Sequence, residues 1–311
     1  MDKRMAIAVD LGATNLRVGL VYPDGRIAVR LQDTTQKQGR DGNTVTEQVS
    51  SLIKRVLAKA GKGTRVLSGV GISSIGPLDY DRGGPRNSPN IPYSFIPLVK
   101  PLGALFHCPV VLLNDCNAAV VGERRFGIGR GLKNLVYLTI STGIGGGVIA
   151  DGKLLLGKSG NAGEIGHLTV DTSYNLPCSC GHGIGHWEGY VSGRNIPRFF
   201  RAWMKKKAVA VPYRIDEARD VFARARTGDL SARKFLDELN KLNARAISNI
   251  VVAYDPELIT LGGSVVLNNR RVILGGIKKY ADDYLPLPPM SVTRLGENIT
   301  LLGAAAAVFE R

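Results

Sequence analysis

The sequence predicts an α/β protein built from two lobes around a cleft, and three observations carry this prediction. Apolar stretches of strand length alternate along the chain with stretches of helical periodicity. A pattern of strand, glycine-containing turn, second strand and closing Asp-Gly pair occurs near the N-terminus and again near the middle of the chain. With 311 residues, the chain also exceeds the usual size of one compact domain.

The elements of the first half follow from the spacing of apolar residues. Continuous apolar runs bounded by turn residues predict buried strands at 5–9, 69–73 and 110–113. Apolar side chains that recur at helical spacing predict a helix over 44–60, and a second helix is predicted over 118–126. Strands and helices therefore alternate from the beginning of the chain.

The second half continues this alternation. The second hairpin occupies 138–149 and is followed by a segment rich in glycine, cysteine and histidine, residues 160–193. The pattern is then mostly helical over 196–254, becomes a strand at 258–261 and ends in a short apolar helix at 304–309. An α/β class accounts for all of these elements.

The domain boundary is predicted from the order of the elements, since no low-complexity linker marks it. We place the boundary at the strand-to-helix step near Asp115. The predicted domains are a small N-terminal α/β lobe, 1–114, and a larger C-terminal α/β lobe, 115–299, which carries the loop 160–193. The C-terminal helix, residues 300–311, is expected to pack back on the first lobe.

The composition excludes several classes of function. The formal charge of +15 calls for an anionic partner, but only 6% of residues are aromatic, and none interleave with the basic clusters as single-stranded nucleic acid would require. Nucleic acid is therefore not expected as a partner, and a basic surface that attracts an anionic nucleotide is favoured. No stretch is long enough to span a membrane and no secretory signal precedes the first strand, so a cytoplasmic location is expected.

The two glycine turns indicate a polyphosphate ligand. A turn without bulky side chains lets backbone N–H groups approach an anion, and hydroxyl side chains add further donors. The first turn contains Gly12, Thr14 and Asn15, and the second contains Thr142 and Gly143. Two such turns in two halves of the chain suggest that the two lobes grip one polyphosphate between them.

Asp10, at the start of the first turn, is a candidate magnesium anchor. A carboxylate beside a phosphate cradle is repulsive unless a cation lies between them, and Mg²⁺ keeps its waters while taking only one or two carboxylates. We therefore expect Asp10 to hold Mg²⁺ through water. The alternative for this turn is an ordinary hairpin with a glycine at a positive φ.

Residues 152–159 match the P-loop pattern literally, but their context does not fit. That motif needs a preceding strand, small residues in the loop and a helix whose N-terminus faces the phosphate. Here residues 153–156 form the apolar return strand of a hairpin, and Gly160-Asn161-Ala162-Gly163 follows in place of a helix. The match is therefore rejected.

Polar residues at strand and loop ends suggest a site for a polyol. Asn114 and Asp115 lie where a strand ends and a helix begins, which is a usual place for a site in α/β proteins. Both residue types also serve as helix N-caps, and a rigidly placed carboxylate suits a general base. Asn90, Glu164 and His167 add short polar groups that can bind hydroxyls.

Residues 167–186 contain three of the four histidines of the chain and two of its four cysteines. Thiolate and imidazole ligands clustered in this way suit a tetrahedral zinc ion. The alternative is a pair of reduced cysteines in a surface loop. The candidate ligands are His167, Cys178, Cys180 and His186, with His182 as a competing fourth ligand.

Together these residues resemble the ROK family of sugar kinases and repressors, within the hexokinase/actin-like ATPase superfamily. The resemblance covers nearly the whole chain and implies an actin-like ATPase (ribonuclease H-like) fold with a nucleotide/sugar cleft between the lobes. Its most specific segments are Gly163-Glu164-Ile165-Gly166-His167, Cys178-Ser179-Cys180-Gly181 and Gly185-His186-Trp187-Glu188.

The resemblance also implies roles for individual residues. Asp115 is implied as the catalytic base, Thr14, Thr142 and Gly143 as the groups that face the phosphates, and Gly262-Gly263 as the contact for adenosine. The residues implied to bind sugar hydroxyls are Asn90, Asn114, Asp115, Glu164, His167 and Glu188.

Two positions depart from the family pattern. The first turn has Gly12-Ala13 where the family usually has two glycines, which is tolerable if Ala13 keeps a negative φ. His186, preceded by one extra residue, replaces the third zinc cysteine of the family. A site made of two cysteines and two histidines remains chemically sound.

The sequence therefore predicts an ATP-dependent hexose kinase that phosphorylates the 6-hydroxyl, of the glucokinase type or with broad hexose specificity. Zinc is structural in this hypothesis, because four protein ligands leave no open position. Kinases for N-acetylmannosamine, N-acetylglucosamine or fructose are the alternatives, as is a non-catalytic sugar-sensing regulator. The regulators of the family carry an N-terminal helix-turn-helix, which is not expected here because the chain begins directly at the first strand. A homodimer is left open.

Overall fold

The computed structural model describes residues 4–311. It is an α/β protein with two mixed five-stranded sheets, which confirms the predicted class. The chain forms two compact units. The first extends to Gly131 and also contains Leu156–Ala162 and Thr293–Arg311, while the second contains Leu132–Leu155 and Gly163–Val292.

The first unit is built on a sheet with the strand order β3-β2-β1-β4-β7. The first three strands in sequence are joined as antiparallel neighbours, whereas β4 and β7 run parallel to β1. The carboxyl ends of β1, β4 and β7 therefore meet at one edge of the sheet. The strands are β1 (Met5–Leu11), β2 (Asn15–Val21), β3 (Ile27–Thr34), β4 (Leu67–Ser74) and β7 (Val110–Asn114).

The second unit repeats this sheet. Its order is β10-β9-β8-β11-β12, again with three antiparallel strands followed by two that run parallel to the first. The predicted repetition of a hairpin thus extends to a whole five-stranded arrangement. The strands are β8 (Leu135–Ile140), β9 (Ile144–Ala150), β10 (Lys153–Leu154), β11 (Leu258–Gly262) and β12 (Met290–Val292).

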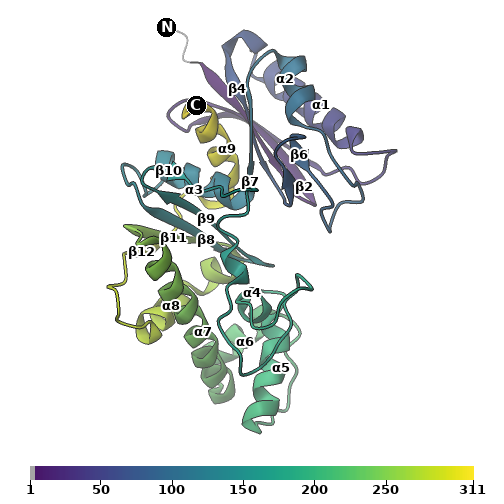
Figure 1. The fold of residues 1–311 in the computed structure, drawn as a ribbon. Coiled ribbons are helices and arrows are strands. Elements are labelled where there is room, and N and C mark those ends of the chain that lie inside the picture. The colour runs from purple at the N-terminus through teal and green to yellow at the C-terminus, as the bar shows by residue number, and fades with distance from the viewer. Residues whose placement is uncertain (1–3) are drawn as a thin grey trace. The chain divides into compact units, whose positions relative to one another are not determined.

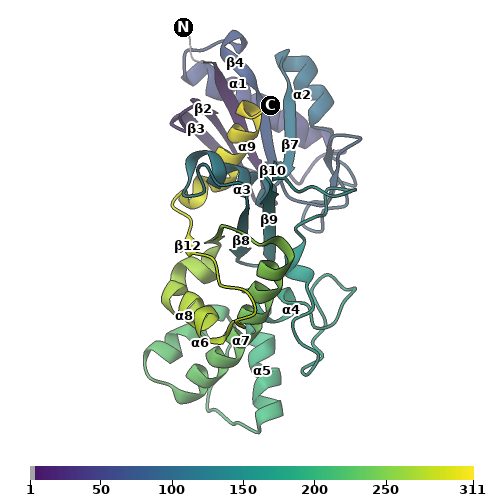
Figure 2. The ribbon, with the colours of Figure 1, turned by 60° about the vertical axis from the view of Figure 1, so that its left-hand side comes forward.

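Helices cover both faces of the first sheet (Figures 1 and 2). Alternate residues of a strand point to opposite faces, and β1 shows this directly. Ile7 and Val9 join the core with α1, whereas Ala6 and Ala8 pack with α9. The regular elements of this unit besides its sheet are α1 (Asn43–Lys59), η1 (Thr64–Val66), β5 (Leu78–Asp79), β6 (Gly84–Pro85), α2 (Val99–Phe106), α3 (Asp115–Phe126), η3 (Gly296–Asn298) and α9 (Ile299–Phe309).

The core of the second unit is rich in aromatic side chains. Trp187, Tyr190, Phe199, Phe200 and Phe235 are fully buried and pack with apolar residues of β8, β9 and β11. Aromatic side chains bury a large area each, so they account for much of the packing energy of this unit. Its helices are η2 (Ile165–His167), α4 (Glu188–Val191), α5 (Ile196–Lys207), α6 (Ala218–Arg226), α7 (Leu230–Tyr254) and α8 (Ser264–Tyr280).

The limits of the compact units differ from those of the predicted domains. Helix α3 belongs to the first unit, because it packs on α9 with backbones in close approach. A Cβ atom on Gly303 would lie 1.7 Å from the carbonyl oxygen of Ala118. The segment Leu156–Ala162 also belongs to the first unit, where a Cβ on Gly160 would lie 2.0 Å from the ring of Tyr80. The chain therefore first leaves the first unit after Gly131 instead of at Asp115.

Several local expectations are confirmed and others are revised. The P-loop match was correctly rejected, because β10 pairs with β9 as a return strand and is followed by a loop instead of a helix. The last helix, expected over 304–309 from its apolar run and over 300–311 as part of the first lobe, spans Ile299–Phe309, and α3 already begins at Asp115. Strands β3 and β12 and helices α2 and α8 were not predicted. Over residues 4–311, no helix combines the length and apolarity needed to cross a membrane.

Candidate active site

The first candidate site lies at the edge of the first sheet where β1, β4 and β7 end. The strand register places Asp10 beside Ser73 and places Ser74 beside Asn114. Asn114 is the N-cap of α3, and its Oδ1 accepts the N–H of Asn117 at 2.7 Å, as expected for a residue between strand and helix. Asp115 is thereby fixed in the first helical turn, where the helix dipole favours a carboxylate.

Asp10 and Asp115 approach closely enough to influence each other. Burial raises the pKa of the Asp10 carboxyl; the cation of Arg17 opposes this rise, and the negative charge of Asp115 adds to it. Two neighbouring carboxylates repel each other, and the guanidinium of Arg17 offsets part of this negative charge. Mg²⁺ held by Asp10 stays a prediction.

Arg17 is a site residue that sequence reasoning missed. It stands directly opposite Asp10 in the β1–β2 register, and its guanidinium pairs with the Asp10 carboxylate at 2.7 Å. The same guanidinium donates to the backbone oxygen of Glu297 at 2.9 Å. Counting residues outward from the first turn would have paired Asp10 with Arg17, because hairpin register follows from the turn.

We expect Arg17→Met to destabilise the protein by about 3–5 kcal/mol at pH 7, because it leaves the buried Asp10 charge without its partner. The pKa of Asp10 is already raised above its ordinary value of 3.8, and removal of Arg17 raises it further. The loss of stability should therefore grow as the pH rises above the raised pKa that Asp10 has in the folded wild type, and shrink at acidic pH, where Asp10 is neutral in both folded proteins. Urea unfolding at several pH values measures this difference.

The matched control for this prediction is Arg55→Met. Arg55 pairs with Asp33 at 2.8 Å, but their side chains are 54% and 32% exposed, and such surface pairs contribute only about 0.2–1 kcal/mol. Equal losses of stability in the Arg17 and Arg55 variants would show that the Asp10–Arg17 pair contributes no more to stability than a surface ion pair.

The first glycine turn has tight backbone geometry. The Gly12 N–H donates to the Asn15 carbonyl at 2.9 Å, and the Thr35 hydroxyl donates to the Gly12 carbonyl at 2.8 Å. Ala13 has a φ outside the positive region, so the alanine that replaces a family glycine is accommodated without strain. The Gly12 amide closes the turn itself, which leaves anion binding at this turn to its other donors.

The second turn is fixed by the segment that follows α4. The N–H of Gly193 donates to the Ser141 carbonyl at 2.7 Å, and the N–H of Arg194 donates to the Thr142 carbonyl. Gly143 leaves room for a carboxylate, since a Cβ there would lie 2.7 Å from Oε2 of Glu188. This turn is therefore held in one conformation by contacts within the second unit.

A cavity of about 530 Å³ opens beside the second turn, within the second unit. It extends toward the start of α8, where Gly263 has a φ of +86° and approaches Ile140 so closely that a Cβ would lie 2.4 Å from its carbonyl oxygen. A helix N-terminus preceded by glycine suits a phosphate group. The lining includes Ser141, Thr142, Arg194, Arg226, Ser264 and Asn268.

The far wall of this cavity contains an irregularity that sequence analysis did not detect. Helix α8 is broken at Asn269, which has φ −134° and ψ 28°. The Asn269 amide donates to the Val265 carbonyl at 2.9 Å, and its oxygen accepts from Arg226 at 3.1 Å. Ser264, which directly follows Gly262-Gly263, lines this cavity, but no local pattern indicated the break of α8 at Asn269.

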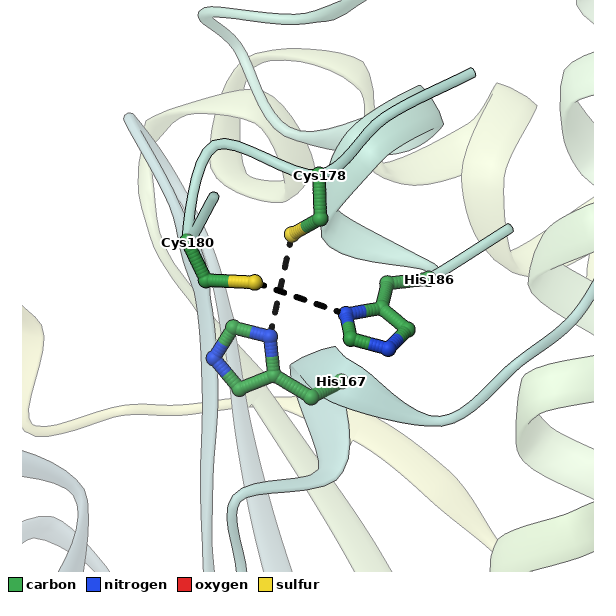
Figure 3. Close-up of side chains that lie close together, drawn as sticks. All are labelled: His167, Cys178, Cys180 and His186. Carbon is green, nitrogen blue, oxygen red and sulfur yellow. Dashed lines mark hydrogen bonds between the residues drawn. The ribbon is translucent and has the colours of Figure 1, made fainter. Parts of the chain in front are cut away.

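The four predicted metal ligands are brought together in the second unit (Figure 3). One ligand atom from each of His167, Cys178, Cys180 and His186 lies within 4.8 Å of all the others. Each sulfur faces one imidazole: Cys178 Sγ lies 3.7 Å from His167 Nδ1, and Cys180 Sγ lies 3.7 Å from His186 Nδ1. His182 is not part of the group that residues 4–311 form, which favours His186 as the fourth member.

The loop geometry explains how these side chains converge. The Cys178 N–H donates to the Gly183 carbonyl at 2.7 Å, and a Cβ on Gly183 would lie 2.0 Å from the ring of His186. Burial and the neighbouring Cys180 raise the pKa of the Cys178 thiol, while burial and His167 lower the pKa of His186. A lowered pKa favours the neutral His186 imidazole that can coordinate a metal, and a bound divalent cation would favour the thiolate form of the cysteines. The donor set is consistent with structural zinc.

The residues implied to bind sugar occur in both units. Asn114 and Asp115 lie at the edge of the first sheet, and Asn90 is exposed in the loop between β6 and α2. In the second unit, Glu164 Oε2 lies 3.7 Å from Nε2 of His167. His167 thus faces a cysteine with one ring nitrogen and a carboxylate with the other, an arrangement that orients histidines at metal sites.

The two mixed five-stranded sheets, which repeat the same strand arrangement, define the ROK/actin-like two-lobed α/β class. Residues 6–311 match the model of the ROK family, and the chain belongs to this family. The chain is 36% identical over 306 residues to a glucokinase of Pyrobaculum calidifontis, which covers 98% of this chain and 95% of that protein.

Solved structures agree with this assignment. The ROK hexokinase of Thermus thermophilus aligns with a TM-score of 0.83 and 31% identity, covering 98% of each chain. A ROK family glucokinase from Streptomyces griseus, solved in complex with glucose and AMPPNP, aligns with a TM-score of 0.74 and 28% identity. That alignment covers 99% of this chain and 100% of the other.

Proposed function

We propose that this protein is a glucokinase, which transfers the γ-phosphoryl group of ATP to the 6-hydroxyl of glucose. The observation that carries the proposal is the placement of Asp115. Its carboxylate is fixed at the N-terminus of α3, directly after the N-cap Asn114 and near Asp10. The similarity to glucokinases over the whole chain supports the choice of reaction and of glucose as the substrate.

Asp115 acts as the general base in this proposal. The sugar O6 attacks the γ-phosphorus, Asp115 accepts the proton of the hydroxyl, and the bond to the β-phosphate oxygen breaks to release ADP. The Oδ1 atom of Asp115 accepts the N–H of Cys116 at 2.8 Å, which holds the carboxylate in a defined orientation. Such positioning matters more than an unusual pKa, because phosphoryl transfer needs little covalent assistance.

The nucleotide is proposed to bind along the second turn and the cavity beside it. Thr142 and Gly143 face the phosphates together with Thr14 and Asn15 of the first turn, while Gly12 shapes that turn through its own N–H bond to the Asn15 carbonyl. Gly262-Gly263 contacts the adenosine, which the cavity of about 530 Å³ has room to accept. Asp10 would hold Mg²⁺ through water, and the ion would supply positive charge that neutralises the phosphates. The repulsion between the Asp10 and Asp115 carboxylates supports this location.

The sugar is proposed to contact six residues, of which His167 also belongs to the cysteine–histidine cluster. Zinc held by all four cluster residues has no open coordination position, so its role is to fix the loop that presents His167 and Glu188. The six sugar-binding residues are Asn90, Asn114, Asp115, Glu164, His167 and Glu188.

The experiment that tests this function measures ADP release with Mg·ATP and a panel of sugars. The panel contains glucose, mannose, fructose, glucosamine, N-acetylglucosamine and N-acetylmannosamine. We expect the highest kcat/KM with glucose. A higher value with an acylated amino sugar or fructose would replace glucose as the substrate. Sugar binding without turnover on any member would support a sugar-sensing regulator instead.

A further inference from the structure

The carboxylate of Glu188 connects the cysteine–histidine cluster to the second glycine turn. Its Oε1 accepts the hydroxyl of Ser179 at 2.6 Å, and Ser179 lies between Cys178 and Cys180. Its Oε2 accepts the backbone N–H of Ile144 at 2.9 Å, directly after the turn that ends at Gly143. The Glu188 side chain therefore contacts both the loop of the cysteine–histidine cluster and the end of the second glycine turn.

Contacts around Glu188 restrict its movement. The amide of Asn195, which is 5% exposed, donates to the Glu188 carbonyl at 3.0 Å and to the Ser192 hydroxyl at 2.9 Å. The Ser192 hydroxyl donates to the same carbonyl at 2.8 Å. The bond from Ser179 to Glu188, at 2.6 Å, is short for a hydrogen bond between two oxygen atoms.

The same segment holds the turn from its other side. Gly193 and Arg194, just after Ser192, donate their N–H groups to the carbonyls of Ser141 and Thr142. The conformation of the turn therefore depends on the segment from Glu188 to Asn195, and the position of the Glu188 carboxylate depends on Ser179. Hydrogen bonds therefore connect the loop that carries Ser179 continuously to the second glycine turn.

We propose that Ser179 is a positioning residue that couples metal binding at the cysteine–histidine cluster to nucleotide binding at the second turn. This inference rests on the proposed function, in which the cluster binds zinc and the turn binds the phosphates of ATP. Metal bound to Cys178 and Cys180 fixes the residue between them, and Ser179 in turn fixes Glu188 against Ile144. Without the metal, the loop loses this constraint and the turn binds nucleotide less tightly.

Thermodynamic linkage makes the coupling measurable in both directions. If zinc raises the affinity for nucleotide by some factor, nucleotide must raise the affinity for zinc by the same factor. Couplings between distinct sites are commonly about 5–150-fold. We expect a value of at least about 5-fold, because the connection consists of a few direct hydrogen bonds within one compact unit.

The test uses the full chain, zinc and Mg·AMPPNP, without sugar. Calorimetry gives the Kd for Mg·AMPPNP of the zinc-loaded protein and of the protein stripped with a chelator that is then removed. Competition with a chelator gives the zinc affinity with and without Mg·AMPPNP, and circular dichroism checks that the stripped protein stays folded, since unfolding would by itself couple the two ligands. The test variant is Ser179→Ala, and the matched control in the same loop is Ser173→Ala. In the wild type, the Ser173 hydroxyl donates to Asp171 at 2.7 Å.

We expect wild type and Ser173→Ala to show the same coupling in both directions. Ser179→Ala should still bind one zinc ion per chain, while its affinities for zinc and nucleotide become independent. Full coupling in Ser179→Ala, or no coupling in wild type, would overturn the inference. Failure of the zinc-loaded wild type to bind Mg·AMPPNP would instead contradict the proposed function.

Discussion

Replacement of Asp115 by asparagine is expected to lower kcat by about 100-fold to 10,000-fold, the usual contribution of a general base. Asparagine keeps an oxygen that can accept the N–H of Cys116, so the start of α3 should remain intact. It cannot accept the proton of the sugar hydroxyl, however. Glucose should therefore still bind with a Kd close to that of wild type. Steady-state kinetics and calorimetry with glucose measure the two effects separately.

The matched control for this variant is Asp24→Asn. Asp24 also lies in the first unit and also accepts a backbone N–H, that of Arg26 at 3.0 Å, but it belongs to the hairpin reversal after β2. This variant should keep normal kcat. Nearly full turnover in Asp115→Asn would remove Asp115 from the mechanism as the base, whatever its contact with the sugar.

Loss of His186 is expected to abolish stoichiometric zinc binding and to lower Tm by roughly 10 °C. Even outer partners of metal ligands change metal affinity about 10–100-fold, so loss of a direct ligand should cost more. Zinc present at 1,000 times its Kd stabilises a folded protein by about 4 kcal/mol. In a unit of 150–250 residues, each kcal/mol shifts Tm by about 2–4 °C.

The comparison of His186→Ala with His182→Ala identifies the fourth ligand. His182 is near the cluster in sequence but absent from the group whose ligand atoms lie within 4.8 Å. His182→Ala should therefore bind one zinc ion per chain and keep the wild-type Tm, as judged by metal analysis and thermal unfolding. Retention of zinc in His186→Ala together with its loss in His182→Ala would reverse the assignment. Retention of zinc in both variants would contradict a four-ligand site, because such a site needs either His182 or His186 as its fourth ligand.

Much of the fold could be predicted because it depends on patterns within short stretches of chain. The alternation of strands with helices, the N-cap at Asn114 and the hairpin return at 153–154 all follow from nearby residues. The cluster could be predicted for a related reason: cysteine and histidine are rare in this chain, and their concentration over 167–186 indicates shared chemistry. The short edge strand β12 and the small helix α2 lacked such patterns.

The sequence by itself determined the class of fold, the repetition of a glycine-turn hairpin and the donor set of the cluster, because propensity, periodicity and ligand chemistry act locally. The packing of α3 on α9 and the contacts that hold Glu188 between Ser179 and Ile144 depended on the tertiary structure. These features join residues from different elements or across a turn. Their energies come from burial and hydrogen bonds that exist only after the chain has folded, so no local pattern announces them.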